Sequence, residues 1–135
     1  MGRSDRPLGA MEQLLDRLAA DGPRDFLIQG DRTVQGTAFV RQVRTAAAAL
    51  RSAGFGTGDR LALYLEKGPE CVVLLWAAAV AGGMAVPLHP LAKDHQVAHI
   101  LKDAEPFGIV TSEAKSALLR DPEGVFRGHR HWTLD

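Results

Sequence analysis

Histidines are the residues of this sequence whose type and spacing most directly suggest a metal site. His95 and His99 are four residues apart, so on a helix both rings would lie on one face and could bind one ion. A closed zinc site needs further strong ligands, and no cysteine or glutamate motif accompanies the pair. Polar Gln96 and Lys102 share the same flank, which favours two surface histidines over a metal site. The remaining histidines invite the metal interpretation with less support: His89, His129 and His131.

A glycine-rich stretch, Gly54-Phe55-Gly56-Thr57-Gly58, is a candidate phosphate-binding loop. Such a loop follows a strand and opens a helix, so that the helix N-terminus faces the anion. This stretch instead follows a predicted helix and enters a predicted strand. We therefore predict a helix cap and a connecting turn here. The phosphate-binding pattern Gly-x-x-x-x-Gly-Lys-Ser/Thr does not occur in the sequence.

Candidate nucleophiles and acid–base residues have little support from their surroundings. Cys71 lies in an apolar stretch, which raises the pKa of a thiol and lowers its reactivity. Ser112 and Ser116 have no glycine elbow beside them. Glu66 and Lys67 follow a predicted strand, where open α/β sheets place functional groups, although a solvent-facing turn is the simpler interpretation. The residues themselves therefore assign no catalytic, cofactor-binding or metal-binding role.

The elements that would position these side chains alternate between helices and strands. Apolar residues at helical spacing predict helices over residues 10–20 and 37–53, and residues 26–29 and 32–34 predict a hairpin or a tight turn. The alternation from residue 61 onward predicts right-handed βαβ units in a mostly parallel sheet with flanking helices, an α/β fold. The elements predicted there are strand 61–65, helix 69–82, strand 84–88, a helix capped by Asp94 and ending at Ala104, strand 107–111, helix 112–119, a turn at 121–124 and strand 131–134.

The centre of the sequence, Cys71 to Leu88, is eighteen residues long and has no charge. A membrane-spanning helix needs about 20 apolar residues. Gly82-Gly83 stops a helix, and Pro87 would break any continuation. We therefore predict a helix and a strand of a folded core. A helix that is apolar on all sides must be covered on all sides, and we expect part of that cover to come from polypeptide outside these 135 residues.

The composition excludes several classes of protein. The chain has 135 residues, 46% of them hydrophobic, and its 16 basic side chains balance 16 acidic ones. A nucleic-acid-binding protein would show a basic excess, so neither nucleic acid nor a membrane is expected as a partner. The lone Cys71 indicates a reducing, cytoplasmic compartment, and the N-terminal stretch is no secretory signal. We expect residues 1–135 to form a single partial domain, with residues 1–10 flexible.

Residues 58–112, GDRLALYLEKGPECVVLLWAAAVAGGMAVPLHPLAKDHQVAHILKDAEPFGIVTS, resemble the N-terminal region of AMP-forming adenylating enzymes. That family includes acyl- and aryl-CoA ligases, luciferases and the adenylation domains of peptide synthetases. The likeness covers about residues 11–115, and one departure stands at Val34-Gln35-Gly36-Thr37, where the family has a Thr-Tyr pair. The features in common are Gly58-Asp59-Arg60, Pro69-Glu70, Ala81-Gly82-Gly83, Val86-Pro87-Leu88, Pro90, Ile100-Leu101-Lys102-Asp103 and Val110-Thr111-Ser112.

The resemblance implies a two-step reaction in a complete enzyme. A carboxylate attacks the α-phosphate of Mg-ATP to give an acyl-adenylate, and a thiol or other acceptor then takes the acyl group. The family's phosphate loop and catalytic lysine lie beyond the matched stretch, so the resemblance transfers no catalytic residue to this chain. ATP and magnesium are implied only for the complete enzyme, and no cofactor is expected for this chain alone.

Three hypotheses remain open from the sequence. The first is the N-terminal segment of an AMP-forming acyl or aryl acid ligase, which would be inactive alone and would need the remainder of the ligase as its partner. The second is a stand-alone, non-catalytic binding or assembly module on the same scaffold, either a dimer or a partner of a separately encoded remainder. The third is a small metal protein that uses His95 and His99. For a bare segment we predict an exposed apolar patch above ~600 Å² and self-association.

Overall fold

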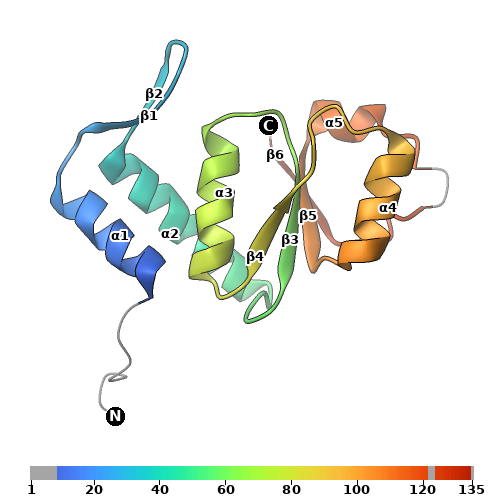
Figure 1. Cartoon of the computed structure of the whole chain (residues 1–135), viewed down its shortest axis with the longest axis horizontal. Helices are drawn as coiled ribbons and strands as arrows, with labels where there is room; N and C mark the ends of the chain where they lie inside the picture. Colours follow the sequence, from blue (N-terminus) through green and yellow to red (C-terminus); the bar gives the residue numbers. More distant parts are fainter. Residues whose placement is uncertain (1–8, 122–123, 135) are drawn as a thin grey trace.

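A computed structural model describes residues 9–121 and 124–134 of the chain. The expected flexibility of residues 1–10 falls mostly on residues 1–8, which lie outside this range, while Ala10 already begins a helix. The predicted turn at 121–124 also lies partly outside it. Figure 1 shows a sheet seen almost edge-on, with helices on both of its sides and a hairpin at one end.

The described chain begins with a helix and a hairpin and continues as alternating strands and helices. Strands β1 and β2 pair antiparallel, and the other four strands form a parallel sheet in the order β4-β3-β5-β6. The mostly parallel α/β fold expected from the sequence is therefore confirmed. The elements are α1 (Ala10–Ala20), β1 (Asp25–Gln29), β2 (Arg32–Gln35), α2 (Gly36–Ser52), β3 (Arg60–Tyr64), α3 (Pro69–Val80), β4 (Met84–Pro87), α4 (Asp94–Ala104), β5 (Gly108–Ser112), α5 (Glu113–Leu118) and β6 (His131–Leu134).

The parallel sheet separates two apolar cores. Leu61 and Leu63 of β3 face one core, which also contains Phe39 of α2 and Ala77 of α3. Ala62 of β3 faces the other core, together with residues of α4 and β5. Residues 61–65 are all buried, as expected for a central parallel strand covered on both faces.

Several predicted boundaries differ from the structure for local reasons. Helix α3 ends at Val80, two residues before Gly82, which takes a φ of 100° in the turn that leads into β4. Asp94 does not cap α4: Lys93 is the N-cap residue, and Asp94 Oδ1 accepts a hydrogen bond from Arg120 N at 3.4 Å. Strand β5 begins one residue later than predicted, at Gly108.

The described residues cover the apolar helix α3 incompletely. Val73, Ala77 and Ala78 are buried, whereas Leu75 is 38% exposed. Other apolar residues of α3 are partly buried, including Leu74 and Trp76. The incomplete cover expected from the sequence is present. In the part of the chain described here, no helix is long and apolar enough to cross a membrane.

Candidate functional site

A polar pocket of about 230 Å³ lies at the carboxyl edge of the parallel sheet, where β3, β5 and β6 end. This is the edge at which open α/β sheets bind ligands. Arg32 of the hairpin lines one side of the pocket, and Glu70 at the start of α3 lines another. The residues that line it are Arg32, Leu65, Glu66, Lys67, Glu70, Ser112 and Leu134.

The structure brings together two residues that the sequence singled out separately. Ser112 Oγ, at the end of β5, donates a hydrogen bond to Glu66 Oε1 at 3.0 Å, just after β3. The same hydroxyl accepts a hydrogen bond from Lys115 N at 3.1 Å and so caps α5. This hydroxyl both donates and accepts a hydrogen bond, and no histidine among the described residues is bonded to it, so Ser112 is arranged as a structural link rather than as a nucleophile.

An ion pair attaches the hairpin to the first turn of α3. Arg32 Nη2 and Glu70 Oε1 are 2.5 Å apart, and Gln29 Nε2 donates to the Lys67 carbonyl at 2.9 Å. The hydrogen bond from Arg32 holds the pKa of the Glu70 carboxyl below its ordinary value, and the same pairing raises the pKa of Arg32. The Arg32 guanidinium is therefore already paired with the Glu70 carboxylate within the pocket.

A second hollow of about 340 Å³ lies at the same edge of the sheet, on the side of α4 and α5. Tyr64 O–H donates to the Ala92 carbonyl at 2.7 Å, and Lys115 Nζ donates to the Pro90 carbonyl and lies 5.1 Å from the centre of the Tyr64 ring. Burial raises the pKa of Tyr64, and the nearby negative charge of Asp94 raises it further. These contacts fix the loop after β4 against the end of β3.

Cys71 is half-buried at the base of the β3–α3 turn. Its Sγ donates to the Glu66 carbonyl at 3.2 Å. Burial raises the pKa of the Cys71 thiol, as the sequence predicted from its apolar surroundings. The thiol is therefore mainly protonated near neutral pH and is a weak nucleophile.

The glycine-rich stretch at residues 54–58 is a connecting turn at the opposite, amino edge of the sheet. It leads from α2 into β3, and Gly56 N donates to Asp59 Oδ2 at 2.9 Å. Gly54 and Gly58 have positive φ values of 100° and 82°. Gly54 directly follows Ala53, the C-cap residue of α2, and the stretch connects this helix to β3, so the helix-cap and turn interpretation is confirmed.

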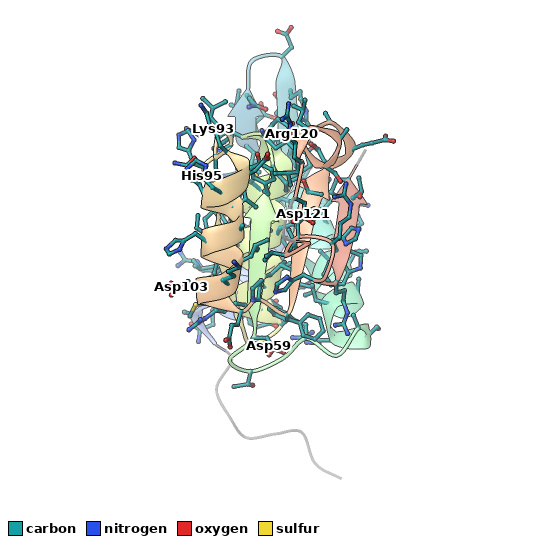
Figure 2. All side chains as sticks on the ribbon, turned by 90° about the vertical axis from the view of Figure 1, so that its right-hand side faces the viewer. Asp59, Lys93, His95, Asp103, Arg120 and Asp121 are labelled. Carbon is teal, nitrogen blue, oxygen red and sulfur yellow. The ribbon has the colours of Figure 1, made fainter. Side chains whose placement is uncertain are left out.

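The histidines lie apart from the polar pocket. His95 and His99 are exposed on the outer face of α4, where Figure 2 shows His95 pointing away from the sheet. His129 Nδ1 lies 2.6 Å from the Val125 carbonyl, and His131 Nδ1 lies 3.1 Å from the His129 carbonyl. Within residues 9–121 and 124–134, no group of three or more His, Cys, Asp or Glu side chains is arranged to hold a metal ion.

Sequence reasoning missed four side chains that shape the two hollows: Arg32, Tyr64, Glu70 and Lys115. Arg32 and Glu70 are 38 residues apart in the sequence, and Lys115 lies 25 residues from Pro90. Glu70 offered a signal, because an acid in the first turn of a helix is a common end-stabilising residue. The other three offered none before the strands were placed side by side.

The fold and this edge define an α/β domain with a parallel sheet and helices on both faces. Residues 15–132 match the family described as AMP-binding enzyme. The chain therefore belongs to the AMP-binding enzyme family, and the resemblance seen in residues 58–112 is confirmed.

Curated relatives of the chain are much longer proteins. The chain is 35% identical over 108 residues to an L-proline–[L-prolyl-carrier protein] ligase from Streptomyces coelicolor, which covers 80% of this chain and 20% of the relative. It is 35% identical over 65 residues to a long-chain-fatty-acid–CoA ligase from Bacillus subtilis, which covers 48% of this chain and 12% of the relative. The chain thus spans about a fifth or less of the length of these relatives, in their N-terminal part.

Solved structures share the fold. MatB from Rhodopseudomonas palustris aligns with a TM-score of 0.78 and 26% identity, over 92% of this chain and 24% of that protein. The N-terminal subdomain of NpsA from Klebsiella oxytoca aligns with a TM-score of 0.73 and 18% identity, over 90% of this chain and 30% of that one. The second likeness shows the fold alone, and it shows that the matched region is less than a third even of an N-terminal subdomain.

Proposed function

We propose that this chain acts as the N-terminal segment of an AMP-forming acyl or aryl acid ligase, provides part of its scaffold and has no adenylating activity alone. One observation carries the proposal: residues 15–132 match the AMP-binding family, yet the chain spans about a fifth of the L-proline ligase relative. In a complete enzyme of this kind, ATP would supply the adenylyl group that activates the acid. The proposed compartment is the cytoplasm, which the free thiol of Cys71 supports.

Two features of the described side chains support this scaffold role over phosphate binding by the chain alone. At the amino edge, Asp59 already accepts from the glycine-rich turn. At the carboxyl edge, Glu66 and Glu70 place carboxylates in the polar pocket, and Glu70 pairs with Arg32. Stabilising a transferring phosphoryl group requires unpaired donors and cations aimed at it. The chain's own contribution is therefore to bind and orient neighbouring structure: the Arg32–Glu70 pair attaches the hairpin to α3, and the Ser112–Glu66 bond links the ends of β5 and β3.

An ATP–pyrophosphate exchange assay tests this proposal. The purified chain should show no exchange with a panel of amino, aryl and fatty acids. The partner in the assay is the polypeptide encoded directly downstream, either in the same open reading frame or in the neighbouring one. Mixing it with the chain should restore exchange. We refer to this partner below as the downstream polypeptide. Exchange by the chain alone would contradict the scaffold role, and a downstream polypeptide that shows full activity without the chain would contradict the need for this segment.

A further inference from the structure

The two edge strands of the parallel sheet offer different backbones to an incoming strand. In a parallel pair, the N–H and C=O groups of one residue face one neighbour, and those of the next residue face the other side. Met84 N donates to the Asp59 carbonyl and Leu88 N to the Leu63 carbonyl, so the alternate positions of β4, Ala85 and Pro87, face outward. Proline has no N–H to offer, which blunts this edge against strand addition.

The β6 edge lacks such protection. Ile109 N donates to the Arg130 carbonyl at 2.9 Å, so Trp132 and Leu134 also face β5, while the backbone groups of His131 and Thr133 face outward. Both residues are exposed. Throughout the described parts of the chain, no strand pairs with this outer side of β6. An open edge of aromatic and β-branched residues without proline is a template for another strand.

An apolar pocket of about 190 Å³ lies directly beside this edge. Trp132 and Leu134 form its wall on β6, and both pack against the core on the α2 and α3 side of the sheet. Small residues of α2 leave the space open on the helix side. The complete lining is Ala46, Ala49, Leu50, Leu74, Val110, Trp132 and Leu134. Its volume would hold one or two large apolar side chains.

We propose that β6 accepts an additional β-strand from the remainder of the adenylating enzyme, and that an apolar side chain of this strand, or of the segment next to it, fills the pocket. The proposal rests on the proposed function, because the matched solved proteins contain three to four times as much polypeptide as this chain. Beyond the proposed function, it specifies where the rest of the ligase joins this chain: at the β6 edge of the sheet and not at the β4 edge. The occupant is one that forms backbone hydrogen bonds to His131 and Thr133 and carries an apolar anchor.

Matched proline substitutions test the edge. Thr133→Pro removes an outward N–H on β6, and Ala85→Pro removes the equivalent outward N–H on β4. Binding of the downstream polypeptide is measured by interferometry for both variants, after circular dichroism has shown that each is folded. We expect Thr133→Pro to weaken binding by at least about tenfold, since it removes a backbone hydrogen bond and adds a ring at the contact, while Ala85→Pro binds like the unmodified chain.

A second pair of variants tests the pocket without touching the strand. Ala49→Phe fills the pocket from α2, and Ala48→Phe places the same ring on an exposed position of α2 outside its lining. Only Ala49→Phe should weaken binding. In addition, amide exchange measured by NMR should be fast at His131 and Thr133 in the chain alone and become slow on binding.

The outcomes separate this proposal from the proposed function. Equal binding by all four variants would overturn strand addition at β6 but leave the assembly of a split ligase intact. Failure of the unmodified chain to bind the downstream polypeptide, or to restore exchange with it, would overturn the proposed function and this inference with it. Self-association of the chain that Thr133→Pro abolishes would show that a second copy, and not the remainder of a ligase, occupies the edge.

Discussion

The helix ends at the two edges of the parallel sheet interact with side chains of opposite charge. At the amino edge, three arginines donate to carbonyls at the ends of helices: Arg51 to Val80 O at 2.6 Å, Arg60 to Ala104 O at 2.9 Å and Arg130 to Ala53 O at 3.5 Å. At the carboxyl edge, the helices begin with acids, which are Glu70, Asp94 and Glu113. Charges of the other sign also lie at each edge: Figure 2 shows Asp59 at one end of the molecule and Lys93 with Arg120 at the other, so the separation concerns the helix ends and not the whole edges.

The helix dipole explains this separation. Helices that connect parallel strands run antiparallel to them, so their partly negative C-termini gather at the amino edge and their partly positive N-termini at the carboxyl edge. Arginines at the first edge and carboxylates at the second therefore stabilise the fold. Charge alone therefore does not mark a site in this chain: the arginines are bonded to carbonyls, while the polar pocket lies beside the acids of the carboxyl edge.

The largest effect is expected at the amino edge, from Gly83→Ala. A Cβ at Gly83 would lie 2.3 Å from the Asp59 carbonyl oxygen and 2.5 Å from the Phe55 ring. The carbonyl belongs to the backbone that starts β3, so it cannot move away without shifting the strand. We expect a loss of about 3 kcal/mol in the free energy of unfolding, measured by urea denaturation.

Gly56→Ala is the control for this substitution. It lies in the neighbouring turn, and a Cβ there would meet no atom within 4 Å. Its free energy of unfolding should change by less than about 0.5 kcal/mol. Equal losses from both substitutions would show that the amino-edge turns are sensitive to any added side chain rather than to the close approach at Gly83.

A smaller effect is expected from Arg51→Met, which removes a guanidinium from the end of α3. The methionine keeps much of the apolar stem, so the change mainly removes the hydrogen bond to the Val80 carbonyl. We expect a loss of about 1 kcal/mol, reduced by high salt because the interaction with the helix end is screened. Arg41 is exposed on the same helix as Arg51, α2, and Arg41→Met should have no comparable effect. A loss as large for Arg41→Met would mean that general charge balance, and not the helix end, is responsible.

The sequence predicted the elements well because their signals are local. The helix at residues 10–20 and the strand at 131–134 are found with the predicted bounds, and the apolar run at 61–65 correctly indicated a strand buried on both faces. The contacts in the polar pocket could not be predicted in this way, because they depend on the order of the strands in the sheet. Glu66 and Ser112 were each noted in the sequence, but their hydrogen bond depends on β3 and β5 being neighbours, which no local pattern specifies.

The smallest effect is expected at the carboxyl edge, from Arg32→Gln. Arg32 lowers the pKa of Glu70, so the folded chain holds that proton less tightly than the unfolded chain. The pair therefore stabilises the fold above the ordinary pKa of a glutamate, and this stabilisation is lost as the pH falls through the lowered pKa of Glu70. Both side chains are about half exposed, at 56% and 49%, so water and salt screen the interaction.

Two measurements check this prediction. In an NMR titration, the Glu70 carboxyl should titrate at a higher pH in Arg32→Gln than in the unmodified chain. Urea denaturation should show a small difference between the two proteins at pH 7 that disappears at strongly acidic pH. An unchanged titration of Glu70 would show that the ion pair is not formed in solution. In that case the bond from Gln29 to the Lys67 carbonyl, and not the ion pair, would attach the hairpin to the β3–α3 turn, and the contrast between the edges would rest on the occupied arginines of the amino edge.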